Sequence, residues 1–134
     1  MPRKQPVAMT RSLGYHSVQV KVVSCPISPC SHKIVLEDLE EQLGRRHITV
    51  RHVETREAGR DTPIALRVRL VHGSAVSFTA SLNLQLIDYP GGQFNSKLVL
   101  NGLETALVAR GVKIGHAETR ANGRGTALAL RLTV

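Results

Sequence analysis

The residues best suited to chemistry form a polar set that occurs twice in the chain. The first set comprises His52, Glu54, Thr55, Arg56, Gly59 and Arg60, and the second comprises His116, Glu118, Thr119, Arg120, Gly123 and Arg124. Histidine transfers protons near neutral pH, glutamate can orient it, and a guanidinium binds an anion through two parallel hydrogen bonds. If a two-fold axis brings the sets together, they predict a cleft that binds phosphate through Arg56, Arg60, Arg120 and Arg124.

An enzyme built on these sets would use four catalytic residues: His52, Glu54, His116 and Glu118. Paired histidines on symmetry-related strands resemble those of two-histidine phosphoesterases, whose lobes are also duplicated. That family has Ser or Thr two residues after each histidine, where this chain has glutamate. In the structural interpretation, which the sequence favours, each histidine lies at the edge of the core beside its glutamate, and a left-handed glycine forms the following turn. Whether the chain is an enzyme stays open.

Positive charge defines a second group of residues. The chain has 18 Lys and Arg against 10 Asp and Glu, a formal net charge of +8 that favours polyanionic partners such as nucleic acid. Strand periodicity gathers six of these residues on one open sheet face: Lys21, Arg51, Arg67, Arg69, Lys113 and Arg131. Further contacts would come from the basic N-terminal residues Arg3, Lys4 and Arg11. With two Tyr, two Phe and no Trp, the sheet has few rings for base stacking, so the predicted binding is sequence-tolerant and salt-sensitive.

An internal duplication must position all of these residues. Residues 17–70 and 81–134 align without a gap and share 19 identities over 54 positions. Random pairing would give about three identities, because a chance match occurs roughly once in eighteen positions. A unit of about 60 residues is only marginally stable by itself. We therefore expect one domain over 17–134 with a shared core, preceded by a basic arm, residues 1–16, that is expected to be flexible.

Each copy is predicted to form a β-α-β-β unit. Strict alternation of aliphatic residues from 18 to 22 and from 82 to 86 is typical of half-buried strands. The next aliphatic residues recur at helical spacing, as Val35, Leu36, Leu39 and Leu43 and as Val99, Leu100, Leu103 and Leu107. Ser31, or Asn95 with Ser96, could cap these helices. Asn101-Gly102 supports an alternative in which Lys97–Leu100 is extended and a shorter helix begins near Gly102.

Two further strands complete each unit. Strands 48–56 and 64–71, like strands 112–120 and 126–134, are expected to pair as hairpins. Strand 64–71 is also expected to pair with a long strand that begins near Ala75. The predicted fold is α+β, a mainly antiparallel six-stranded sheet with two helices on one face and a pseudo-two-fold axis. Its element order is similar to that of ferredoxin-like and dodecin-like small α+β proteins, which have many functions.

The cysteines and the N-terminus bear on cofactors and compartment. Cys25, Cys30 and His32 supply at most three zinc ligands at an unusual spacing, so we predict neither a metal nor another cofactor. The two cysteines are interpreted as ordinary loop or core residues, with a redox-sensitive or loop disulfide as the alternative. No apolar run approaches the roughly 20 residues of a membrane span, and no signal-peptide core follows the first residues. We therefore predict a cytoplasmic protein with no membrane partner.

Three functions remain in order of preference. The first is a non-enzymatic protein that binds RNA or DNA on a duplicated sheet. The second is an enzyme or a binder of small anions or nucleotides that uses the paired His-x-Glu-Thr-Arg sets. The third is a homo-oligomeric assembly subunit whose exposed sheet edges join copies of the chain.

Overall fold

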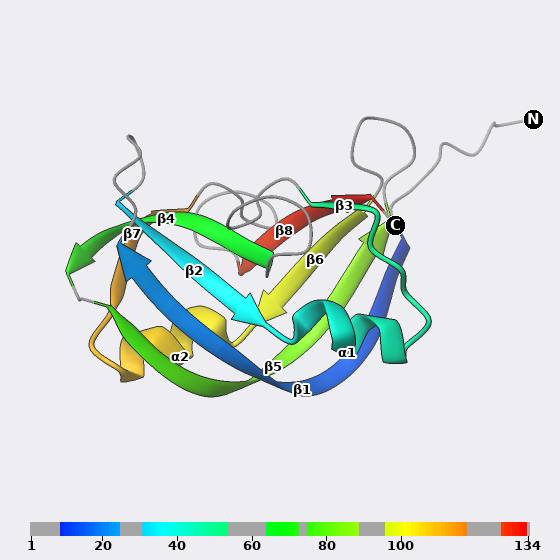
Figure 1. Ribbon diagram of the computed structural model, residues 1–134, viewed down its shortest axis with the longest axis horizontal. Helices are drawn as coiled ribbons and strands as arrows, with labels where there is room; N and C mark the ends of the chain where they lie inside the picture. The colour runs from blue at the N-terminus through cyan, green and yellow to red at the C-terminus, as the bar shows by residue number, and fades with distance from the viewer. Residues whose placement is uncertain are drawn as a thin grey trace, which may run out of the picture.

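The structure is a computed structural model and describes residues 9–24, 31–53, 64–72, 75–88, 96–117 and 127–133. Within these residues the chain forms eight strands and two short helices (Figure 1). The first copy contains β1 (Met9–Ser24), β2 (His32–Glu37), α1 (Leu39–Arg45), β3 (His52–Val53) and β4 (Ile64–His72). The second copy contains β5 (Val76–Asp88), β6 (Ser96–Asn101), α2 (Leu103–Ala109), β7 (Lys113–Ala117) and β8 (Leu128–Thr133).

All described strands belong to one antiparallel sheet with the order β3-β8-β6-β5-β1-β2-β4-β7. The long strands β1 and β5 pair at its centre. The two halves have matching registers, since Lys33 is paired with Arg67 between β2 and β4, and Lys97 with Arg131 between β6 and β8. The fold therefore has an internal two-fold arrangement that follows the alignment of the two copies.

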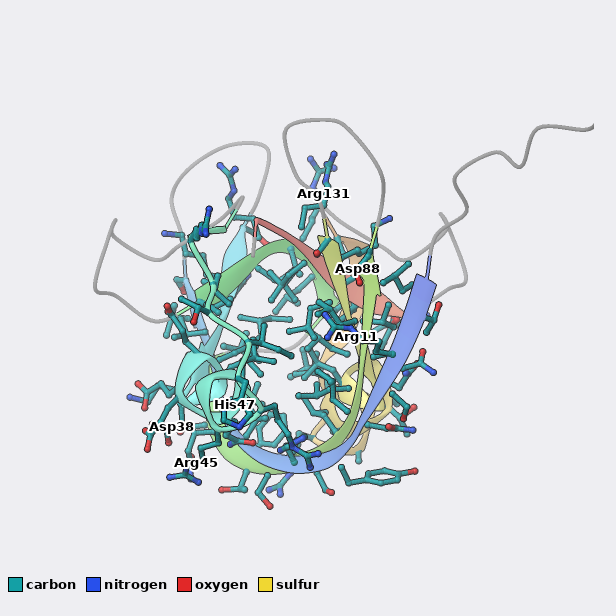
Figure 2. The ribbon with its side chains drawn as sticks, turned by 90° about the vertical axis from the view of Figure 1, so that its right-hand side faces the viewer. Arg11, Asp38, Arg45, His47, Asp88 and Arg131 are labelled. Atoms are coloured by element: carbon teal, nitrogen blue, oxygen red, sulfur yellow. The ribbon has the colours of Figure 1, made fainter. Side chains whose placement is uncertain are left out.

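The sheet curls into a partly closed barrel whose inner side holds the core (Figure 2). Because side chains alternate between the faces of a strand, every second residue of β1 and β5 points inward. Val18, Val20 and Val22 are fully buried in this core. They meet the equivalent residues of β5, Leu82, Leu84 and Leu86. The predicted alternation of these two strands is confirmed.

The helices lie at opposite ends of the barrel (Figure 1). Each has seven residues and buries two leucines, Leu39 and Leu43 in α1 and Leu103 and Leu107 in α2. The prediction of a six-stranded sheet with two helices on one face is therefore wrong. The described sheet has eight strands, and its curvature leaves no flat face for the helices to cover.

The predicted longer helices are wrong because residues 32–37 and 96–101 are strands. Ile34, Val35 and Leu36 are all at most 2% exposed, so β2 is buried on both faces. Such a strand has a continuous apolar run, and with the leucines of α1 this run imitates helical spacing. The alternative for the second copy is confirmed, because α2 begins directly after Gly102.

The predicted helix caps also differ from the structure. Asp38 and Gly102 precede the two helices, with left-handed φ angles of 66° and 94° and no capping hydrogen bond from a side chain. Ser31 lies beside β2, and its Oγ accepts a hydrogen bond of 3.2 Å from the backbone N–H of Leu70. Ser96 belongs to β6, and Asn95 lies outside the described residues.

The predicted pairings of the last strands are wrong as well. In the described residues β3 pairs with β8 of the other copy, and β4 pairs with β2 and β7. β5 pairs with β1 and β6, so β4 and β5 are not neighbours. Alternation shows which side of a strand faces the core, but it does not show which strand lies beside it.

The N-terminal part of β1 extends the sheet beyond the repeat. This strand begins at Met9, so residues 9–16 of the predicted arm lie in a strand. Neither α1 nor α2 has the length and apolar character needed to cross a membrane, and no other helix occurs in the described ranges.

Candidate anion-binding surfaces

The repeated polar set is described only at its two histidines, and only for their backbones. His52 is paired with Thr133 across β3 and β8, and His116 is paired with Arg69 across β7 and β4. β3 and β7 are the first and last strands in the sheet order. The other members lie outside the described residues, including Glu54, Arg56, Arg60, Glu118, Arg120 and Arg124. A shared cleft formed by both sets therefore stays a prediction.

The outer side of the sheet carries two pairs of cationic residues, which we call the basic pairs. Lys33 in β2 is directly opposite Arg67 in β4, and Lys97 in β6 is directly opposite Arg131 in β8. These residues alternate with core residues of the same strands, so they belong to the outer side. Figure 2 shows Arg131 extending away from the barrel interior.

The basic pairs belong to a patch that is identical in the two copies. Val35 is paired with Ala65 next to the first basic pair, and Val99 is paired with Ala129 next to the second. All four of these small residues are at most 3% exposed, although they too alternate with the inner core. Several inner positions of the strands exchange Val, Ile and Leu between the copies, although Leu36 and Leu66 are kept as Leu100 and Leu130, whereas this outer patch does not change. The outer patch is thus more restricted in residue type than most of the core.

The structure separates the six residues that were expected to share one sheet face. Arg67, Arg69 and Arg131 lie on the outer side. Lys21 is also there, with its Nζ 2.8 Å from Oε1 of Glu37. Arg51 and Lys113 instead line two pockets at the ends of the barrel.

Sequence reasoning missed Lys33 and Lys97, the other halves of the basic pairs. Their identity between the copies was visible in the alignment. Their positions opposite Arg67 and Arg131 depend on the register of β2 with β4 and of β6 with β8, which no local sequence pattern predicted.

A pocket follows each helix, at equivalent places in the two copies. The first, which we call the basic pocket, has a volume of about 370 Å³ and is lined by Arg11, His47, Ile48, Thr49 and Arg51. The second, which we call the apolar pocket, has about 380 Å³ and is lined by Glu104, Val108, Gly111, Val112, Lys113 and Ile114. The copies have therefore diverged in the chemistry of the same pocket.

Metal binding has no support in the part of the chain that the structure describes. There, no three side chains of His, Cys, Asp or Glu form a group that could hold an ion. His32 has its Nδ1 2.8 Å from Oγ of the neighbouring Ser31. Cys25 and Cys30 lie outside the described residues, so the predictions about them are not tested.

Comparison with known proteins gives no match to a protein-family model, to a curated protein or to a solved structure. The function is therefore argued from the two surfaces alone.

Proposed function

We propose that the protein binds RNA or DNA through phosphate contacts on the outer side of its sheet. The observation that carries this proposal is the presence of the two basic pairs, identical in residue type and register in both copies. A nucleic-acid-binding role also fits the cytoplasmic location predicted from the sequence.

Each basic pair places two like charges directly opposite each other on neighbouring strands. Like charges directly opposite on neighbouring strands destabilise the pairing, by an amount on the order of a few tenths of a kcal/mol to 1 kcal/mol. Each of the four residues also has an interaction within the protein, and a phosphate would add to it. A phosphate between Lys33 and Arg67, or between Lys97 and Arg131, removes the repulsion and gains charge-assisted hydrogen bonds.

The proposed binding does not involve recognition of the bases. Tyr15 is the large exposed aromatic side chain of the described residues, at 72% exposure. It pairs with Asn83 between β1 and β5, whereas the basic pairs lie in strands farther from the sheet centre. The described strands β2, β4, β6 and β8 contain no Phe, Tyr or Trp. Binding there is governed by phosphate charge, so it tolerates any sequence.

The test is fluorescence anisotropy of labelled single- and double-stranded RNA and DNA over a series of KCl concentrations. We expect saturable binding whose affinity falls steeply with salt. Arg131→Gln and Arg67→Gln should each weaken binding and reduce the salt slope by about 0.7–0.9, the value for one phosphate contact.

Arg45→Gln is the matched control because it removes the same charge from a different side of the molecule (Figure 2). Arg45 lies in α1 with its Nη2 2.9 Å from Oε1 of Glu41. No binding at low salt, or an equal loss for Arg45→Gln, would show that the basic pairs do not hold nucleic acid.

A further inference from the structure

We propose a second site, in the basic pocket of the first copy, that binds a phosphate monoester or inorganic phosphate. Its volume of about 370 Å³ lies at the lower end of the range for ligand pockets, roughly 300–1,000 Å³. Arg11 comes from the start of β1, and His47 and Arg51 come from the segment that follows α1. Two arginines, a histidine and a threonine thus line one small pocket. This site does not depend on nucleic-acid binding at the basic pairs.

Arg11 is held in place by a short polar chain. Oγ of Ser96 donates a 3.0 Å hydrogen bond to Oδ1 of Asp88. Oδ2 of Asp88 lies 3.6 Å from Nε of Arg11. This contact uses Nε, and the terminal nitrogens of a guanidinium carry four further N–H donors. Asp88 therefore orients Arg11 and lowers the net positive charge of the pocket by one.

His47 occupies a backbone conformation that favours glycine. Its φ angle is 63°, and the equivalent residue of the second copy is Gly111 with a φ of 79°. A left-handed conformation is strained for a residue with a Cβ atom, and such strain concentrates at functional sites. Because glycine occupies the equivalent position in the second copy, the backbone turn does not require a histidine. The pocket gives the imidazole a role as a hydrogen-bond donor to an anion.

The second copy provides an internal comparison. There His47 and Arg51 are replaced by Gly111 and Gly115, and the register of β1 and β5, with its bulge between Ser12 and Gly14, puts Val76 at the position of Arg11. The apolar pocket keeps a similar volume but is lined by Val108 and by the acidic Glu104, with Lys113 as its one cation among the described lining residues. The proposal therefore predicts a phosphate site in the basic pocket and none in the apolar pocket.

Isothermal titration calorimetry of the full chain tests this site. The ligands are inorganic phosphate, adenosine 5′-monophosphate and adenosine, which lacks the phosphate. We expect the first two to bind in the basic pocket and adenosine not to bind. If the nucleotide binds more tightly than phosphate, the site takes an ester, and if the two bind equally, it takes the free anion.

The variants distinguish the basic pocket from other cations. Arg51→Gln and Arg11→Gln should each weaken phosphate binding at least tenfold, and Arg51→Lys should be intermediate because it keeps the charge but loses the bidentate geometry. Lys113→Gln in the apolar pocket and Arg45→Gln in α1 are the matched controls and should bind phosphate normally. Thermal unfolding confirms that each variant is folded.

Two results would overturn the proposal. One is phosphate binding that Arg51→Gln leaves unchanged, or a loss caused by Lys113→Gln as large as that caused by Arg51→Gln. The other is no heat of binding with millimolar phosphate for the folded wild-type chain. Nucleic-acid binding by Arg51→Gln separates the two proposals, because it should persist when the phosphate site is lost.

Discussion

Ser17 of β1 is paired directly with Ser81 of β5, and these two serines are equivalent residues of the two copies. The pseudo-two-fold axis therefore passes between them. The outermost strands are exchanged across this axis, since β3 pairs with β8 and β7 pairs with β4. Each copy thus completes the half of the sheet that the other copy begins.

This exchange predicts that the first copy forms a dimer by itself. A fragment of residues 1–74 contains β1 to β4, but its β4 lacks the partner β7. In a homodimer, β1 pairs with its own symmetry mate around Ser17, and β3 of one fragment takes the place of β7 beside β4 of the other. Size-exclusion chromatography with light scattering should give twice the fragment mass. A stably folded monomer would contradict the exchange, and mixing with residues 75–134 should restore the full fold.

A cation–π contact in the second copy predicts a difference in stability between two equivalent arginines. The guanidinium carbon of Arg110 lies 4.9 Å from the ring centre of Phe78. The equivalent residues of the first copy are Arg46 and Gly14, so no ring is present at that place. Arg110→Gln should lower the free energy of unfolding by about 0.5–1 kcal/mol. Arg46→Gln is the control and should change it by less than about 0.5 kcal/mol in urea unfolding. Equal effects would show that the ring contact contributes nothing.

His47 and Gly111, which are equivalent residues with left-handed φ angles, predict opposite effects of substitution on the free energy of unfolding. His47→Gly should raise the free energy of unfolding by about 1 kcal/mol because it removes a strained Cβ atom, and it should weaken phosphate binding. Gly111→Ala should lower the free energy of unfolding by about 1 kcal/mol for the reverse reason. Urea unfolding at equilibrium measures both. If His47→Gly destabilises the protein, the imidazole makes packing contacts that outweigh the strain.

Sequence reasoning succeeded where one local pattern had one structural meaning. The alternation around Val20 and Leu84 predicted the two central strands, and Asn101-Gly102 gave the alternative start of α2. It failed where two structures share a pattern. The apolar run of β2 suited a helix as well as a strand buried on both faces. A hairpin within one copy and a pairing with a strand of the other copy bury the same residues, so the sequence pattern did not distinguish these two arrangements.

The candidate sites were predictable only in part, for a related reason. Arg67 and Arg131 were assigned to the outer side by simple alternation. The basic pocket joins Arg11 to His47 and Arg51, residues 36 and 40 positions away in the chain. Its signal in the alignment was a difference between the copies, because His47 and Arg51 are both replaced by glycine in the second copy. A search for residues that are identical in the two copies therefore overlooks His47 and Arg51.

The outer patch predicts an unusual sensitivity to substitution on the outer side of the sheet. Val35 is 2% exposed although it alternates with the inner core of β2, whereas Val71, at the end of β4, is 60% exposed. Val35→Ser removes buried methyl groups and buries a hydroxyl, so it should lower the free energy of unfolding by about 1–3 kcal/mol. Val71→Ser makes the same chemical change at an exposed site and should stay within about 0.5 kcal/mol of the wild type. Urea unfolding of both variants compares them directly. Equal, small effects would mean that the outer patch is accessible to water, and the identity of Val35 and Val99 would then require a role in ligand binding.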